Sequence, residues 1–194
     1  MQVSDLIVIW GGNPVNTQVN VMTHAMKARK DRGAKIACVD IYETGTMKQA
    51  DIKLLIRPGT DGALACAVMH VLFRDGYADW DYLEKFTDAP REFAAHLRAK
   101  TPEWAAKICD IPAADIEAFA KLIGETKRTF FRIGYGFTRS RNGDNQAFTN
   151  TTAINGDLAR GGSLQQRLYD RNPCWKESRA ALRNSETFCD LFRC

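Results

Sequence analysis

Two carboxylates and a pair of glycines stand where a nucleotide could be bound. Gly11 and Gly12 follow an apolar run, and glycines let the backbone approach a ligand while the next N–H groups receive a phosphate. Asp40 ends a second apolar run, where a carboxylate can accept hydrogen bonds from ribose hydroxyls. Asp61 follows a third run, and its carboxylate suits a purine edge with two adjacent donors, which is guanine. These residue types indicate chemistry for binding a guanine nucleotide.

Each of these residues also has a purely structural interpretation. Glycine turns follow the strands of every doubly wound protein, and the sequence contains no GxGxxG. Asp61 can be a helix cap, Asp40 a solvated strand end, and Asn13-Pro14 a simple turn. Spacing alone therefore leaves nucleotide binding and plain chain reversal both open.

The elements that must position these residues alternate along the chain. Short apolar runs at 5–10, 35–41, 52–57 and 129–133 predict strands, and the first two are separated by an amphipathic stretch at 19–32 that ends at Gly33. Strands joined by a helix must be parallel, with a right-handed crossover. The pattern predicts an α/β fold with a doubly wound, mainly parallel, Rossmann-like sheet, in which ligands collect at the carboxyl ends of the strands.

Several helices are expected around and between these strands. One follows Thr60 or Asp61 as its N-cap, and four shorter ones are predicted at 80–86, 91–100, 101–109 and 113–124. The four form a helical insertion at about residues 77–125. A further helix is predicted at 144–158, although its threonines and Asn150 are poor helix formers.

Composition excludes several classes of function. The chain has 194 residues, 45% of them hydrophobic, and a net charge of +4, which is too mild to indicate a nucleic-acid or membrane-surface partner. No run approaches the roughly 20 apolar residues of a membrane helix. The six cysteines form no CxxC, and the histidines at 24, 70 and 96 fall in helical stretches away from the strand ends. No catalytic triad or metal site is therefore predicted.

The segments together resemble the catalytic subunits of the molybdopterin oxidoreductase family, the group that includes dimethyl sulfoxide reductase, formate dehydrogenase and nitrate reductase. The resemblance depends on the combination and order of three motifs, since none is specific alone. They are the first strand with Trp10-Gly11-Gly12-Asn13-Pro14, the second strand ending in Val39-Asp40 with Thr44 and Thr46 after it, and Arg57-Pro58-Gly59-Thr60-Asp61-Gly62-Ala63-Leu64. Weaker similarity continues through Gly134-Tyr135-Gly136 to Gly162.

This resemblance implies a domain that holds a molybdopterin guanine dinucleotide, with molybdenum carried by the intact enzyme. Trp10, Gly11 and Asn13 would line the dinucleotide at the first strand end. Asp40 would hold the ribose, Thr44 would lie near the phosphates, and Gly59 and Asp61 would meet the guanosine. Gly134 and Gly136 would belong to a loop near the pterin.

The resemblance also implies what this chain lacks. The family's iron–sulfur cysteine cluster, its molybdenum ligand and its carboxyl-terminal domain are absent, so we expect no iron–sulfur cluster here and no catalysis by the chain alone. Its partners would be the cofactor and the remaining segments of a parent enzyme. We expect residues 1–162 to form the cofactor-binding domain, and 163–194 to be an unassigned tail, disordered or non-native in sequence.

Two other functions remain to be distinguished from this one. The chain could be an inactive remnant or a module that binds a guanine nucleotide without redox activity. A free-standing Rossmann-type dehydrogenase is disfavoured by the missing GxGxxG.

Overall fold

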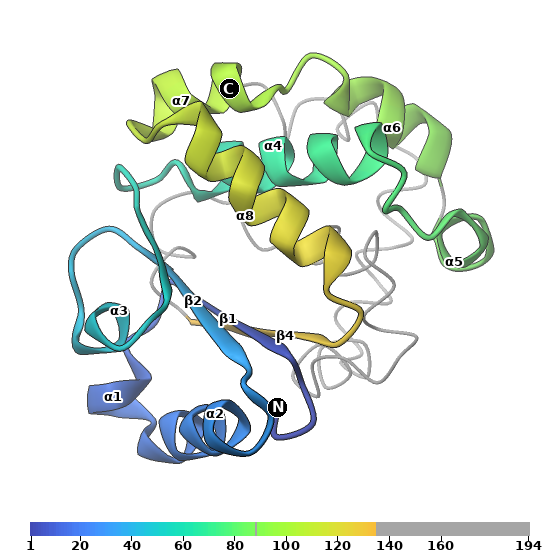
Figure 1. Cartoon of the computed structure of the whole chain (residues 1–194). Coiled ribbons are helices and arrows are strands. Elements are labelled where there is room, and N and C mark those ends of the chain that lie inside the picture. The colour runs from blue at the N-terminus through green and yellow to red at the C-terminus, as the bar shows by residue number, and fades with distance from the viewer. Residues whose placement is uncertain (88, 135–194) are drawn as a thin grey trace, which may run out of the picture.

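A computed structural model describes residues 1–87 and 89–134 of the chain, and Figure 1 shows how their helices and strands are arranged. In chain order the elements are β1 (Leu6–Trp10), α1 (Pro14–Thr17), α2 (Val19–Arg32), β2 (Lys35–Asp40), α3 (Gly45–Lys48), β3 (Ile52–Leu55), α4 (Asp61–Arg74), α5 (Trp80–Phe86), α6 (Pro90–Leu97), α7 (Pro102–Cys109), α8 (Ala113–Glu125) and β4 (Thr129–Ile133).

The four strands form one parallel sheet in the order β3-β2-β1-β4. The chain adds β2 and β3 on one side of β1 and then returns to the other side with β4. This reversal beside β1 is the kind of switch point at which parallel sheets bind ligands, outside the carboxyl ends of the strands. The predicted α/β class and parallel sheet are confirmed.

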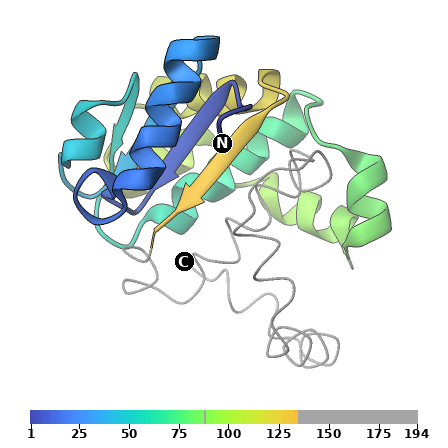
Figure 2. The ribbon, with the colours of Figure 1, turned by 90° about the horizontal axis from the view of Figure 1, so that it is seen from below.

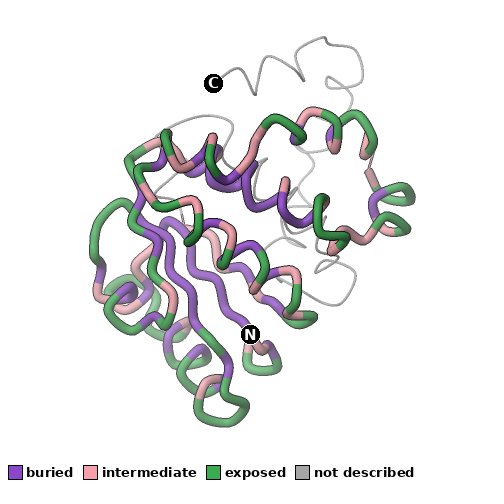
Figure 3. The backbone as a smooth tube through the Cα atoms, turned by 45° about the horizontal axis from the view of Figure 1, so that its top comes forward, coloured by how far each residue is buried: buried purple, intermediate pink, exposed green. Residues whose placement is uncertain are grey.

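Helices cover both faces of the sheet. Side chains alternate along β1, so Ile7 and Ile9 pack with α2 on one face while Leu6, Val8 and Trp10 pack under α4 and α8 on the other. Figure 2 shows the two helical layers on either side of β1 and β4. All five residues of β1 are buried, and Figure 3 shows the strands as the buried centre with exposed surface on the outer helices. A strand buried on both faces explains the continuous apolar run in the sequence.

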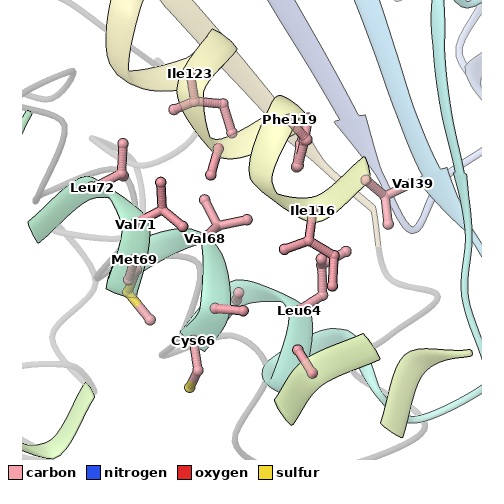
Figure 4. Close-up of a cluster of buried hydrophobic side chains, with 14 of the residues drawn as sticks. Val39, Leu64, Cys66, Val68, Met69, Val71, Leu72, Ile116, Phe119 and Ile123 are labelled. Carbon is pink, nitrogen blue, oxygen red and sulfur yellow. The ribbon is translucent and has the colours of Figure 1, made fainter. Parts of the chain in front are cut away.

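The larger core lies between the sheet and the predicted helical insertion. Ten of the 14 residues of α4 are buried, as expected for a helix that has partners on several sides. Figure 4 shows Val68 and Leu72 directed toward Ile116 and Ile123 of α8, whereas Cys66 and Met69 point to the opposite side. The insertion at about 77–125 is thus confirmed as helices α5 to α8. Within it, α7 and α8 pack against each other and against α4, which precedes the insertion.

Two short helices were not predicted from the sequence. α1 and α3 have four residues each, too few for an apolar period to mark them. The start of α4 agrees with the prediction, since Thr60 is its N-cap residue. No side chain caps this end, because the Thr60 hydroxyl donates to the Arg57 carbonyl and the Asp61 carboxylate accepts from the Trp10 indole.

Some predictions fall outside the described residues: the helix at 144–158, Gly136 with its loop, and the tail at 163–194. Within 1–87 and 89–134, no helix is both long and apolar enough to span a bilayer.

Candidate functional site

The candidate site lies at the carboxyl edge of the sheet, where the loops that follow all four strands meet. Eight of the nine predicted site residues belong to these loops or to the strand ends that lead into them. They are Trp10, Gly11 and Asn13 after β1, Asp40 and Thr44 after β2, Gly59 and Asp61 after β3, and Gly134 after β4. The parallel sheet brings segments that lie up to 124 positions apart in sequence to one edge, and Gly134 N–H donates to the Trp10 carbonyl at 2.8 Å.

Glycines allow the loops after β1 and β4 to touch backbone to backbone. A Cβ on Gly134 would lie 2.0 Å from the Gly11 carbonyl oxygen and 2.7 Å from the Gly12 Cα. Gly11 itself has a φ of 63°, in the left-handed region that favours glycine. Residues with side chains could not keep these two loops in contact.

A buried hydrogen bond joins Trp10 to Asp61. The Trp10 indole Nε1–H donates to Asp61 Oδ1 at 2.8 Å, and Asp61 is only 2% exposed. Its other carboxylate oxygen, Oδ2, is also buried and has no hydrogen-bond partner in the described part of the chain. A buried carboxylate oxygen without a donor is costly, so it indicates a place for a ligand N–H or O–H.

Burial sets the acidity of this carboxyl. Burial raises the pKa of Asp61, and the nearby charge of Asp40 raises it further. Hydrogen bonds from the Trp10 indole and from Asp61's own backbone N–H offset part of this increase. Burial likewise raises the pKa of Asp40, against a hydrogen bond from the Ile41 N–H to Oδ1 at 2.8 Å. The Asp40 carboxylate at the end of β2 thus acts on the Asp61 carboxyl at the start of α4.

Asn13 and Thr44 make contacts that shape the loops. Asn13 Oδ1 accepts from the Thr46 hydroxyl at 2.9 Å and from the Thr46 N–H at 3.3 Å, while Thr46 Oγ1 accepts from the Val15 N–H at 3.2 Å. Thr44 is the N-cap of α3, and its Oγ1 accepts from the Met47 N–H at 3.0 Å. Together these bonds fix α3 against the loop that follows β1. Thr46 was not among the predicted site residues, although it belongs to the same sequence motif as Thr44.

A cavity of about 300 Å³ opens beside these loops on the face that carries α1 and α2. Its lining comes from the ends of β1 and β4 and from the segment around α1: Ile9, Gly11, Gly12, Asn13, Pro14, Thr17, Gln18, Arg132 and Gly134. The Arg132 guanidinium donates to Gln18 Oε1 and to the Ile133 carbonyl at this place. Amide, hydroxyl and guanidinium groups around one cavity suit an anionic ligand such as a phosphate. Arg132 was not predicted, and its only signal was a charge within an otherwise apolar strand.

The other candidate nucleophiles and ligands are structural. Burial raises the pKa of the Cys38 thiol to about 12 and that of Cys109 to about 11, so both stay protonated at neutral pH and lack thiolate reactivity. Residues 1–87 and 89–134 contain no cluster of three His, Cys, Asp or Glu side chains that could hold a metal ion. The described groups at this edge are hydrogen-bonding and charged side chains and backbone.

Comparison with known proteins agrees with this architecture. The protein-family model for molybdopterin oxidoreductase matches residues 1–160. The chain is 39% identical over 138 residues to the probable oxidoreductase YoaE of Bacillus subtilis, which covers 71% of this chain and 20% of that protein. It is 36% identical over 164 residues to the probable dimethyl sulfoxide reductase chain YnfF of Escherichia coli, a match that covers 72% of this chain and 20% of YnfF. It is 30% identical over 174 residues to the alpha subunit of the F420-dependent formate dehydrogenase of Methanocaldococcus jannaschii, a match that covers 89% of this chain and 26% of that subunit.

A solved structure shares the fold. The acetylene hydratase from Pelobacter acetylenicus superposes with a TM-score of 0.70 at 21% identity, over 80% of this chain and 22% of that one. The chain spans about a fifth to a quarter of the length of these relatives, so it corresponds to a segment of such enzymes. The match to the family model over most of its length shows that the chain belongs to the molybdopterin oxidoreductase family, whose enzymes carry a pterin cofactor with molybdenum.

Proposed function

We propose that this chain binds the guanine dinucleotide part of the molybdenum cofactor at the carboxyl edge of its sheet. One observation carries the proposal: Asp61 is a 2% exposed carboxylate that keeps an unpartnered oxygen, Oδ2, at the switch point of a parallel sheet. Guanine offers two adjacent N–H donors on one edge, and an ionised carboxylate accepts from both. A bound guanine would satisfy the oxygen that the described residues leave without a donor.

The neighbouring groups suit the rest of a dinucleotide. Asp40 retains acceptor capacity for ribose hydroxyls, since the hydrogen bond from the Ile41 N–H uses Oδ1. Gly59 has a φ of 76° and forms the turn before α4, where its lack of a side chain leaves the backbone open to the guanosine. Thr44 and Asn13 would act near the phosphates chiefly by holding their loops, because their side-chain oxygens already accept hydrogen bonds.

The cavity beside Arg132 suits the more distant part of the cofactor. The Arg132 guanidinium supplies positive charge there for a phosphate or for the polar pterin. We propose that Gly134 and, from the sequence, Gly136 belong to the loop on the pterin side. The bound cofactor would supply electron or oxygen-atom transfer at molybdenum, and the protein would hold and tune it.

We also propose that such transfer needs segments that this chain does not contain. The chain matches only 20% of YoaE and of YnfF, which supports a role in binding one portion of the cofactor. A guanine-nucleotide-binding module without redox activity is the second candidate, and it shares the Asp61 site with the first.

Thermal unfolding of the full chain tests the proposal. GDP or molybdopterin guanine dinucleotide should raise the midpoint of unfolding, whereas NAD should leave it at the value in buffer. At a ligand concentration of about 100 times Kd the gain in stability is about 2.7 kcal/mol. A response to NAD in place of GDP would show a dinucleotide site of the dehydrogenase type and sink the proposal.

Substitution of Asp61 tests the guanine contact directly. Asp61→Ala should abolish the GDP response because it removes the only acceptor proposed for the guanine edge. Asp31→Ala, which removes an exposed carboxylate on α2, is the control and should respond to GDP like the unmodified chain. If Asp61→Ala still responds in full, the guanine assignment is wrong.

A further inference from the structure

The Trp10 side chain packs in the hydrophobic core. It is fully buried at the end of β1, and its ring packs against Phe119 of α8 with the centroids 6.2 Å apart at an interplanar angle of 58°. Phe119 is itself only 1% exposed, so the indole plane is held between the sheet and α8. The sole polar atom of this side chain is nevertheless used, because Nε1–H donates to Asp61 Oδ1 at 2.8 Å across 51 positions of sequence.

This bond makes the two oxygens of Asp61 unequal. Oδ1 has a fixed donor on a rigid ring, whereas Oδ2 has none among residues 1–87 and 89–134. A carboxylate without the indole bond could turn about its Cβ–Cγ bond and exchange the two oxygens, since that torsion is broad. With the indole in place, one orientation is favoured and Oδ2 is the oxygen left for a ligand.

We propose that Trp10 is a positioning residue for guanine recognition: its indole N–H holds the Asp61 carboxylate so that Oδ2 remains oriented for the donors of the base. The inference rests on the proposed function of Asp61. In this role Trp10 does not line the dinucleotide, as the family resemblance implies, but acts on the ligand through Asp61.

The same bond affects which purine the site accepts. Burial and the charge of Asp40 raise the pKa of Asp61, whereas the hydrogen bond from the Trp10 indole N–H lowers it. The charge of Asp61 in turn raises the pKa of the Cys109 thiol. An ionised carboxylate is a pure acceptor and suits guanine, whereas a protonated one also donates and could pair with the donor and acceptor of adenine. Trp10 would therefore favour guanine over adenine by stabilising the ionised form of Asp61.

The test compares Trp10→Phe with Trp104→Phe in the full chain. Both substitutions remove an indole N–H and keep an aromatic ring, but Trp104 lies on α7, where its ring packs under the Lys100 ammonium, and its indole does not bond Asp61. Because Phe is smaller, replacement of Trp10 by benzothienylalanine provides a second variant, in which sulfur takes the place of the N–H in a ring of the same size. This second variant avoids a core cavity.

Two measurements separate the role of Trp10 from the proposed function. Carboxyl NMR titration without ligand should give a higher pKa for Asp61 in both Trp10 variants and no change in Trp104→Phe. GDP affinity should fall about tenfold in the Trp10 variants, the range expected for loss of a hydrogen bond to a charged group, and the preference for GDP over ADP should narrow.

The outcomes differ for the two claims. Unchanged GDP affinity and purine preference in the Trp10 variants, with GDP bound by the unmodified chain, would overturn the role of Trp10 alone. Failure of the unmodified chain to bind GDP would overturn the proposed function and this inference with it, even where the titration shows that Trp10 and Asp61 are coupled.

Discussion

At the scale of single residues, two glycines allow two backbone segments to lie against one another. The loops that leave β1 and β4 touch at Gly11 and Gly134, where a Cβ on Gly134 would meet the Gly11 carbonyl oxygen at 2.0 Å. Backbone atoms cannot move aside as the end of a flexible side chain can. The two loops would have to separate at the point where the Gly134 N–H bonds the Trp10 carbonyl.

Gly134→Ala is therefore expected to destabilise the protein by about 3 kcal/mol, a value typical of an overpacked site that cannot relax. Urea unfolding measures this change. Gly12→Ala is the control, because a Cβ there would lie 3.3 Å from the Gly134 Cα and needs a shift of only a few tenths of an ångström. Equal stability of the two variants would show that the loops have room to separate.

The position of the two aspartates at the carboxyl edge of the sheet could be predicted from their place after apolar runs. The bonds around them could not. A hydrogen bond between Trp10 and Asp61 depends on the rotation of α4 over β1, which spacing does not determine. Arg132 was missed because a single charge in Thr129–Ile133 is compatible with either an exposed strand end or a cavity wall.

At the scale of elements, α3 is held by side-chain hydrogen bonds more than by its own length. A helix of four residues is too short to be stable by itself. Thr44 caps its start, and Thr46, which is fully buried, bonds both Asn13 and the Val15 N–H in the loop after β1. Longer elements such as α2 and α4 could be predicted from apolar spacing, whereas α1 and α3 depend on these contacts and gave no periodic signal.

Thr46→Val keeps the shape of the side chain and removes its hydroxyl, so Asn13 Oδ1 and the Val15 N–H each lose a partner. We expect a loss of about 2 kcal/mol in the free energy of unfolding, because buried groups are left without hydrogen bonds.

Thr23→Val is the matched control for this prediction. Its exposed hydroxyl bonds only the Val19 carbonyl within α2, and the substitution should change stability by less than about 0.5 kcal/mol. If denaturant curves for the two variants coincide, the contact between α3 and the β1 loop does not contribute as described.

At the scale of the whole molecule, the described residues 6–134 contain one sheet, two helical layers and eight of the nine residues predicted for the site. A binding domain at 1–162, with residues 163–194 unassigned, stays a prediction from the sequence. The class and strand directions followed from the alternation of apolar runs with helices, because a crossover helix forces parallel strands. The strand order did not follow from that alternation, since β4 could have been added at the β3 edge equally well.

A chain shortened to residues 1–162 is expected to unfold at the same temperature as the full chain and to keep the same response to GDP. A chain shortened to 1–128 is the control. It lacks β4, which pairs with all five residues of β1, and should show no cooperative unfolding. A lower midpoint or a lost GDP response in 1–162 would place the domain boundary beyond residue 162.

The position of β1 in the sheet has a consequence for how the protein is made. β1 is synthesised before β2 and β4. It can pair with β2 early, but its other edge stays open until Thr129–Ile133 has been synthesised. The Asp5 N–H, just before β1, likewise donates to the distant Arg128 carbonyl at 2.8 Å. Contacts between such distant segments form slowly. During that interval an apolar strand at the centre of the future sheet presents an unpaired edge, which other chains can join. We therefore expect this protein to aggregate more readily while it is being synthesised than after the sheet has formed.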